Sequence, residues 1–317
     1  MNRFCSPANE NNKMCLSDKA LKKLVTIWNS FQKNKINLKK CSGMNAYKCL
    51  NNRLKHDCGS DKYWLWCDVM EIMVEKIPYI DTNKIAKIKR DLRIIAKKEL
   101  KPEKPMIWYK KPKTWLSNFD IQNVMVQYEQ TLKYKYAFLG VFPIDFSVMS
   151  QGKCVHSNLC SINIQRYAKM NKRFIGLITN LDKHDQPGSH WTSTFMVIDP
   201  KLQTYGAYYY DSTGKGIPSY LLNFINKVKT QCDALFPEKT FVIFQNKKQH
   251  QYKNSECGVF SMVFQIRWIN KHIVKKNNTS FQEIVANPFI NDEKMLEIRD
   301  TLFRPNNKIE LKKLKLI

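Results

Sequence analysis

A lysine- and proline-containing run at residues 101–113 separates two regions that differ in hydrophobic periodicity. Before this run, apolar residues recur every three or four positions in four successive stretches, as they do on one face of a helix. The four expected helices cover residues 17–31, 45–54, 64–74 and 82–95. The sequence therefore predicts a basic, all-helical domain over residues 16–100, after a disordered segment at residues 1–15 and before a linker at residues 101–113.

The region after the linker, residues 114–317, mixes two periodicities and is expected to form one domain. Stretches rich in β-branched and aromatic residues predict strands at 138–146, 174–179, 191–198, 205–210 and 240–245. Helical patterns occupy residues 118–128, 219–234, the segment that begins at Cys257, and 293–302, before a basic tail at 308–317. Mixed strands with segregated helices predict an α+β fold.

Three residues in the second region, in the order His, Asp and Cys, have the chemistry of a thiol nucleophile site. A cysteine attacks as the thiolate, so it needs a histidine that takes its proton and a carboxylate or amide that orients the histidine ring. Cys257 begins an apolar helical run, and a helix N-terminus favours the anion. His190 begins one expected strand and Asp211 ends the next, so the carboxylate is expected to reach the far ring nitrogen of the histidine.

Gln251 lies six residues before Cys257, and its side-chain amide can donate to an oxyanion together with the Cys257 N–H. Each of these residues also has an ordinary interpretation. Cys257 can be a small buried hydrophobe, His190 a surface histidine, and Asp211 a turn residue before Ser-Thr-Gly. Only the six-residue spacing distinguishes Gln251 from the neighbouring glutamines. Order, spacing and flanking residues together favour catalysis.

Four motifs resemble those of the SUMO-deconjugating cysteine proteases and their relatives in the adenovirus-protease clan: Trp115-Leu116-Ser117-Asn118, His190-Trp191, Asp211 and Gln251-x5-Cys257-Gly258. Residues 118–121 and 142–146 are most similar to the branch found in large DNA viruses, which includes the poxvirus core protease and the African swine fever virus polyprotein protease. The resemblance extends over about residues 105–317. It implies a papain-like fold, which agrees with the α+β pattern.

The resemblance implies a cysteine protease that hydrolyses peptide bonds through an acyl-enzyme and needs no metal or organic cofactor. It also implies that Trp191 and Trp115 face each other across the cleft and leave room only for glycine at the cleavage position, as in Gly-Gly-x or Ala-Gly-x. Alternatively, Trp191 is a core aromatic and Trp115 packs on the linker. Asn118 stands where cellular deconjugating enzymes carry Asp, which favours cleavage of viral structural polyprotein or core precursors during virion maturation.

Two other classes of function stay open at the level of sequence. A deSUMOylase or deubiquitinase-type isopeptidase would carry the same proposed catalytic residues. A net charge of +26 also fits a basic nucleic-acid-binding scaffold whose protease fold is inert. Nucleic acid or acidic core proteins are therefore candidate partners of the basic domain at residues 16–100, although a lysine- and asparagine-rich surface can equally reflect a biased genome.

The sequence also suggests a compartment for the protein. No apolar run reaches the about 18 residues that a membrane span needs, and the N-terminus lacks a signal-peptide core. We therefore expect the host cytoplasm, at viral assembly sites, and the virion core. The ten cysteines are then expected to be thiols. Two groups suggest a metal site but lack the close cysteine pair of structural zinc sites: Cys41, Cys49, His56, Cys58 and Cys67, and Cys154, His156 and Cys160.

Overall fold

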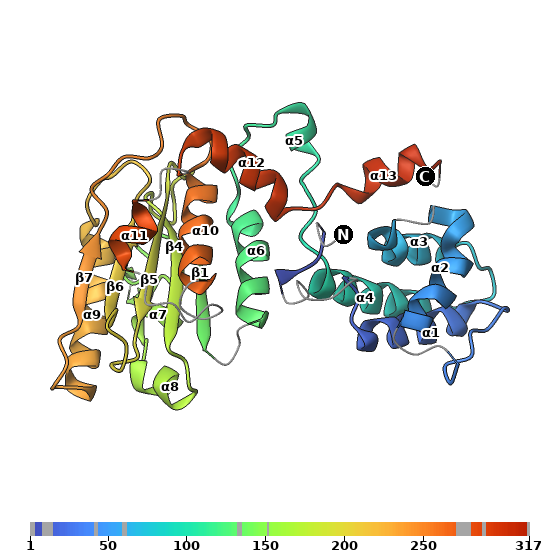
Figure 1. The fold of residues 1–317 in the computed structure, drawn as a ribbon, viewed down its shortest axis with the longest axis horizontal. Helices are drawn as coiled ribbons and strands as arrows, with labels where there is room; N and C mark the ends of the chain where they lie inside the picture. The colour runs from blue at the N-terminus through green and yellow to red at the C-terminus, as the bar shows by residue number, and fades with distance from the viewer. Residues whose placement is uncertain are drawn as a thin grey trace. The chain divides into compact units, whose positions relative to one another are not determined.

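The chain divides into two compact units in the computed structural model (Figure 1). The first consists of Met1–Lys110 together with Asp300–Ile317, and the second of Lys111–Arg299. The structure describes residues 4–7, 15–40, 44–58, 62–131, 135–150, 152–270, 280–286 and 290–315. The unit boundary near Lys110 lies within the expected linker, whereas the C-terminal segment, expected in the second domain, groups with the first unit. No described helix is long and apolar enough to cross a membrane.

Helices make up the first unit, around a core of aliphatic and tryptophan side chains. The Ser17 hydroxyl accepts the N–H of Ala20 at the start of the first helix. The buried Glu99 carboxylate accepts the N–H and the hydroxyl of Ser17, both at 2.9 Å, and so ties the end of α4 to the start of α1. The elements are α1 (Asp18–Phe31), α2 (Met44–Cys58), a 3-10 turn (Tyr63–Leu65), α3 (Trp66–Glu75), α4 (Thr82–Glu99), α5 (Ile107–Lys110) and α13 (Asn307–Lys313).

Both terminal segments of the chain contain ordered structure in this unit. Within the segment expected to be disordered, residues 1–15, the described Cys5 forms a β-bridge with Leu100 and a disulfide with Cys15. The expected basic tail contains α13, whose Leu311 is buried in the core of the first unit. A few buried side chains, Cys5 and Cys15 in one segment and Leu311 in the other, hold these segments. They are too few to form a periodic pattern in the sequence.

The second unit is built on a five-stranded sheet with the strand order β1-β4-β5-β6-β7. The strands are β1 (Tyr136–Pro143), β4 (Phe174–Asn180), β5 (Trp191–Val197), β6 (Gly206–Tyr210) and β7 (Val242–Gln245). The two outer pairs are parallel and the inner pairs are antiparallel. Because β5 begins just after His190 and the antiparallel β6 ends just before Asp211, both residues lie at the same end of these two neighbouring strands.

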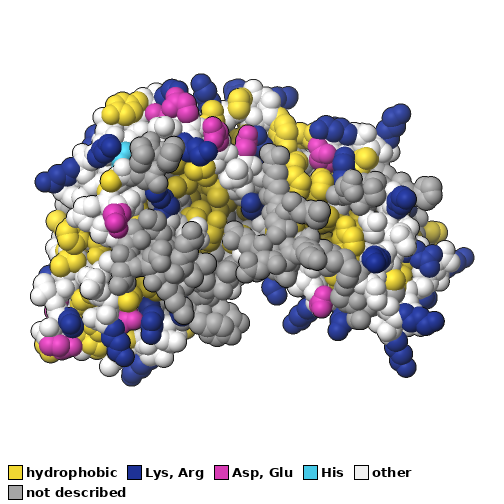
Figure 2. Space-filling model, in the orientation of Figure 1, with side chains coloured by type: hydrophobic (Ala, Val, Ile, Leu, Met, Phe, Trp, Pro, Cys, Tyr) yellow, Lys and Arg dark blue, Asp and Glu magenta, His cyan; other side chains and the backbone are white. Residues whose placement is uncertain are grey.

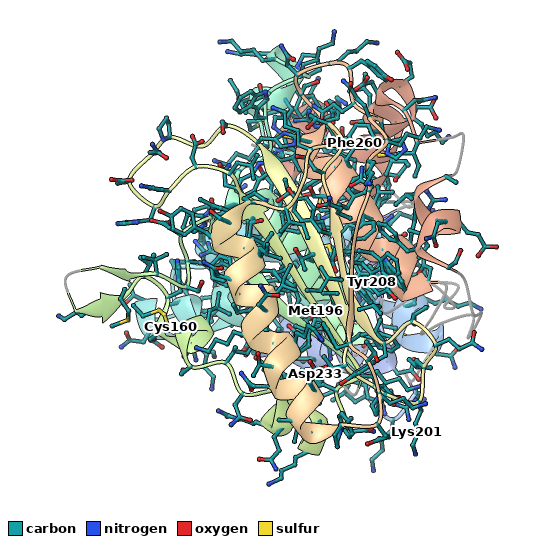
Figure 3. All side chains as sticks on the ribbon, turned by 90° about the vertical axis from the view of Figure 1, so that its left-hand side faces the viewer. Cys160, Met196, Lys201, Tyr208, Asp233 and Phe260 are labelled. Carbon is teal, nitrogen blue, oxygen red and sulfur yellow. A yellow bond between two sulfur atoms is a disulfide. The ribbon has the colours of Figure 1, made fainter. Side chains whose placement is uncertain are left out.

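Helices cover both faces of this sheet (Figure 1). On one face, α9 (Ser219–Leu235) packs Phe224 and Val228 into a cluster with Met196 of β5 (Figure 3). On the other face, α10 (Cys257–Trp268) stacks Trp268 on Phe195 with ring centroids 5.1 Å apart. The remaining elements are α6 (Asn118–Thr131), β2 (Met149–Ser150), β3 (Lys153–Cys154), α7 (Ser157–Cys160), α8 (Ile164–Lys169), α11 (Phe281–Val285) and α12 (Asp292–Leu302), whose last residues belong to the first unit. The α+β fold class is thus as predicted.

The expectation that all cysteines are thiols is wrong. Disulfides join Cys5 to Cys15, whose Cα atoms lie 4.6 Å apart, and Cys154 to Cys160 (Figure 3), which the turn before α7 brings to a Cα–Cα distance of 6.3 Å. Cys49 is also disulfide-bonded. Among the described residues no group of three or more His, Cys, Asp or Glu side chains is placed to hold a metal ion, and Cys41 lies outside the described residues.

Candidate active site

Cys257 is the first residue of α10, and its thiol is free and buried. The preceding residue, Glu256, starts the helix by accepting the N–H of Phe260 with its carbonyl at 2.9 Å. Backbone N–H groups at a helix N-terminus carry partial positive charge, which stabilises a thiolate. The helix expected from the apolar run after Cys257 is present, and the thiol lies at its N-terminus.

A buried glutamine fixes α10 against the sheet. The Gln265 side-chain NH₂ donates to Ser193 Oγ and to the carbonyl of Thr194, each at 2.8 Å, and its Oε1 accepts the hydroxyl of Tyr136 at 3.1 Å. All four residues are buried. Because β5 also begins next to His190, these bonds connect the helix that carries the thiol to the strand that follows the histidine.

Gly258, next to the nucleophile, is closely covered by three side chains. A Cβ atom at this position would lie 3.3 Å from Leu116 Cβ, Ile121 Cδ1 and Trp191 Cδ1. Trp191 also donates its indole N–H to the carbonyl of Leu116 at 3.1 Å. Glycine at this position therefore allows the segment before α6 and the start of β5 to close over the N-terminus of α10.

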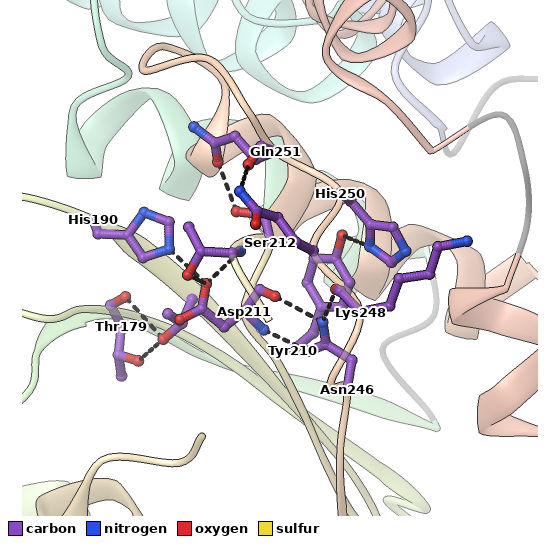
Figure 4. A network of polar contacts seen from close by, with 12 residues as sticks. Thr179, His190, Tyr210, Asp211, Ser212, Asn246, Lys248, His250 and Gln251 are labelled. Carbon is purple, nitrogen blue, oxygen red and sulfur yellow. Dashed lines mark hydrogen bonds and ion pairs between the residues drawn. The ribbon is translucent and has the colours of Figure 1, made fainter. Parts of the chain in front are cut away.

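The His190 ring lies between Asp211 and Cys257. Its Nε2–H donates to Asp211 Oδ1 at 2.8 Å, which leaves Nδ1 for the cysteine (Figure 4). Burial disfavours the charged ring, but the hydrogen bonds with Asp211 and Cys257 outweigh it and raise the pKa of His190 to about 9. The protonated ring next to the thiol is the arrangement in which a histidine activates a cysteine.

Asp211 is fully buried and held from several sides (Figure 4). Its Oδ1 also accepts the N–H and the hydroxyl of Thr213, at 2.7 and 2.8 Å. Asn246 fixes the Asp211 backbone by accepting its N–H and donating to its carbonyl, both at 2.8 Å. Burial alone would raise the pKa of Asp211, yet the hydrogen bonds from His190 and Thr213 lower it below its ordinary value. The carboxylate therefore stays ionised opposite the imidazole.

Gln251 belongs to the same polar network (Figure 4). Its Oε1 accepts the Ser212 hydroxyl at 2.6 Å, and its Nε2 donates to the carbonyl of Lys253 at 2.6 Å. An amide nitrogen carries two hydrogens, so one donor is used in this contact and the second remains. Ser212 directly follows Asp211, so the network links the proposed oxyanion donor to the carboxylate.

A hollow of about 570 Å³ opens beside these residues. Its lining includes Trp115, Asn118 and Trp191, the three residues expected to bind substrate, together with Asp182 and Gly188. The Trp115 side chain is 47% exposed, which argues against the alternative that it packs on the linker. Trp191 is only partly buried, and it lines the hollow.

Comparison with known proteins adds sequence relatives from two viruses, although no protein-family model matches the chain. A protein of Acanthamoeba polyphaga mimivirus named as a thiol protease is 34% identical over 180 residues, 54% of each chain. A cysteine protease of African swine fever virus is 28% identical over 129 residues, which are 41% of this chain and 43% of that protein. The chain thus matches these relatives over about half of their length.

The fold has a counterpart among solved structures. A crystal structure of an African swine fever virus protease aligns with 96% of both chains at a TM-score of 0.61 and 19% sequence identity. The predicted resemblance to viral cysteine proteases is confirmed. The structural alignment covers nearly the whole chain, whereas the two sequence matches cover about half of it.

Sequence reasoning missed the residues that hold the candidate site in place. Asn246, Thr213 and Ser212 fix Asp211 and Gln251, and a buried ion pair joins Glu256 to Arg299. Ser212 and Thr213 had a signal, because a Ser-Thr pair directly after an aspartate often bonds locally. Arg299 had none, since its partner is 43 residues away in the chain.

Proposed function

We propose that this protein is a cysteine endopeptidase in which Cys257 is the nucleophile and His190 the general acid and base. The observation that carries the proposal is the His190 ring, whose Nε2–H donates to Asp211 Oδ1 at 2.8 Å and whose pKa is raised to about 9 by its interactions with Asp211 and Cys257. The similarity to viral proteins named as cysteine or thiol proteases supports the same activity.

The proposed reaction has two halves. The Cys257 sulfur attacks the carbonyl carbon of the scissile peptide, and His190 carries the thiol proton to the leaving amine as the C–N bond breaks. Water then attacks the carbonyl carbon of the thioester, and His190 accepts a proton from the water. The C–S bond breaks, His190 returns the proton to the Cys257 sulfur, and the carboxylic acid is released. Asp211 orients the ring and stabilises its charged form. The oxyanion accepts hydrogen bonds from the Cys257 N–H and from the second hydrogen of the Gln251 amide.

The proposed substrate has glycine before the scissile bond, in a Gly-Gly-x or Ala-Gly-x sequence. The support is the hollow beside the site, which Trp115 and Trp191 both line. Two indole rings leave little room for a side chain, whereas a glycine backbone can pass. Asn118 lies in the same lining, where its amide can bond to the substrate backbone.

The proposed biological role is cleavage of structural polyprotein or core precursors during virion maturation, at assembly sites in the host cytoplasm and in the virion core. Both sequence relatives described above come from viruses, which supports a viral role. We further propose that nucleic acid binds the basic helical unit. Lys and Arg side chains are spread over its surface (Figure 2), and on α4 the exposed basic residues are Lys84, Lys87, Arg90, Arg93, Lys97 and Lys98.

Cleavage of short peptides tests the activity. Wild type is expected to cleave peptides containing Gly-Gly-Ala or Ala-Gly-Ala after the glycine, and Cys257→Ala is expected to lose all cleavage. Cys232→Ala is the matched control, because Cys232 is also a free buried thiol but belongs to α9, in the core cluster on the other face of the sheet. Cleavage of a ubiquitin-like C-terminal tail alone would assign an isopeptidase. No cleavage of either substrate would contradict the proposal and favour the inert scaffold.

A further inference from the structure

One acidic and one basic side chain of α12, those of Asp292 and Arg299, reach the segment that precedes Cys257. Asp292 begins this helix and Arg299 follows seven positions later, so both lie on the same side of the helix. Both side chains are buried. The Asp292 Oδ2 accepts the N–H groups of Tyr252 and Lys253, at 2.8 and 3.2 Å, directly after Gln251. The carboxylate therefore fixes the backbone that follows the proposed oxyanion donor.

Arg299 connects two separate segments of the second unit. Its Nη1 donates to Glu256 Oε1 at 2.9 Å, and the side chains of both residues are only 2% exposed. Its Nη2 donates to the carbonyl of Thr114. One guanidinium group thus joins the residue before the nucleophile, Cys257, to the residue before Trp115.

Both segments determine the geometry of the proposed active site. The Glu256 backbone orients the peptide group that carries the Cys257 N–H, the proposed oxyanion donor. On the other side, Trp115 lines the hollow, and Leu116 accepts the indole N–H of Trp191 at 3.1 Å. A shift of either segment would change the distance between the oxyanion donor and the wall of the hollow.

A role in stability alone explains this ion pair poorly. Removing two charges from water costs about as much as their attraction returns, and hydrophobic residues of similar size in place of a buried pair are often as stable or more stable. What such residues cannot do is donate hydrogen bonds in two fixed directions, which the planar guanidinium of Arg299 does toward Glu256 and Thr114.

We propose that Arg299 and Glu256 are positioning residues that fix the Cys257 N–H relative to the Trp115 wall of the hollow, and that Asp292 does the same for the segment after Gln251. The inference rests on the proposed cysteine protease function. It assigns to α12 the role of setting the oxyanion site, without contact between these side chains and the reacting atoms. The pair acts on transition-state binding more than on the reactivity of the thiol.

The test compares wild type with the double variant Glu256→Gln/Arg299→Met, which removes both charges together and so leaves no unpaired buried ion. Three quantities are measured: kcat and KM on an Ala-Gly-Ala peptide, the inhibition constant of an acetyl-Ala-Gly aldehyde, and the alkylation rate of Cys257 by iodoacetamide across pH. The aldehyde adduct needs the oxyanion donors, whereas alkylation needs only the thiol and His190. We expect kcat to fall and the inhibition constant to rise, each by roughly 10²-fold, with an unchanged alkylation profile.

Two further variants control the result. Arg173→Met/Asp199→Asn removes another arginine–carboxylate pair, 3.3 Å apart and more exposed, beyond the end of β5 that lies away from His190, and is expected to leave all three readouts unchanged. Arg299→Lys keeps the charge but cannot hold both partners at once, so it is expected to retain intermediate kcat.

Each outcome decides between two claims. If wild type cleaves the peptide and the double variant keeps wild-type kcat and aldehyde affinity, the positioning role is overturned while the protease function stands. If the alkylation profile changes together with kcat, the pair acts on the thiol and the proposal is also overturned. A wild type that neither cleaves the peptide nor binds the aldehyde overturns the proposed function, and this inference with it.

Discussion

His190 is the residue whose ionisation depends most on its neighbours. The bonds to Asp211 and Cys257 raise its pKa from 6.5 to about 9, so the folded state binds the proton more tightly than the unfolded state. The stabilisation is fully present below pH 6.5 and is lost as the pH rises through about 9. Asp211 has a lowered pKa, so its contribution is lost only at acidic pH, as the pH falls through its folded-state value.

Urea unfolding at several pH values measures this contribution. The difference in free energy of unfolding between wild type and His190→Gln is expected to be constant near pH 5–6.5 and to shrink by at most about 3 kcal/mol toward pH 10. His184→Gln is a control, because His184 is also paired to an aspartate, Asp145, at 2.7 Å, but its side chain is 47% exposed. A difference that grows with pH would contradict the charged pair.

The Asp211 carboxylate is expected to matter for turnover. Asp211→Asn retains the shape of the side chain but removes the charge that stabilises the imidazolium, so kcat should fall by about 10²–10⁴-fold. Steady-state peptide cleavage measures the effect. Asp233→Asn is the matched control, because Asp233 lies on the surface of α9 and pairs only with Lys229 in the described structure (Figure 3). Equal activities of the two variants would remove Asp211 from the mechanism.

Single residues were predictable where one chemistry needs several residue types together. Cys257, His190 and Asp211 could be proposed from the sequence because a thiol nucleophile needs a base and an orienting carboxylate, and each of the three lies at one end of a periodic segment. Asp292 and Arg299 were not, because both resemble ordinary charges on an amphipathic helix until the fold brings them to Glu256 and to the segment after Gln251.

The elements α10 and β4 meet at a glycine that has no room for a side chain. A Cβ atom at Gly176 would lie 2.3 Å from both Gln265 Oε1 and the Tyr136 hydroxyl oxygen. Gly176→Ala is therefore expected to displace Gln265 and to lower the free energy of unfolding by about 1–3 kcal/mol. Gly216→Ala is the control, since the nearest atom to its Cβ would be 3.5 Å away. Chemical denaturation of both variants checks this, and equal stabilities would contradict the packing role.

Long elements were predictable and short ones were not. The strand predicted at 174–179 and the helix predicted at 219–234 agree with β4 and α9 to within one residue at each end, since each has a full hydrophobic period. The two-residue strands β2 and β3 have no period to recognise. The disulfide between Cys154 and Cys160 depends on the turn between them, and the expected compartment argued against it.

At the scale of the whole molecule, the main features are the net charge of +26 and the division of the chain into two units. The basic surface of α4 is expected to contact phosphates. Lys87→Glu/Arg90→Glu should therefore weaken binding of a 20-nucleotide single-stranded DNA and reduce the magnitude of the slope of log K against log salt by about 1.4, about 0.7 for each lost contact. Fluorescence anisotropy at several salt concentrations measures this. Lys201→Glu/Lys215→Glu makes the same change in net charge in the second unit and is expected to have a smaller effect. Equal effects would indicate general charge attraction only.

The grouping of Asp300–Ile317 with the first unit was not predictable from the sequence. This segment has the composition of a lysine-rich tail, but burial of Leu311, ion pairs of Arg304 with Glu103 and of Glu310 with Lys62, and the bond from Asn307 to Asp68 attach it to the helical unit. Composition did indicate the basic character of that unit and the position of the linker near Lys110, because both depend on local residue types.

The most direct test of the central claim is covalent trapping of the nucleophile. The protein is incubated with an acetyl-Ala-Gly vinyl methyl ester, and intact-mass and peptide-level mass spectrometry locate the adduct. The proposed mechanism predicts one adduct per chain, on Cys257, formed by wild type and by Cys232→Ala but slowed by at least about 10²-fold in His190→Ala. Labelling of several cysteines at similar rates, or an adduct on Cys257 that forms equally fast without His190, would contradict it.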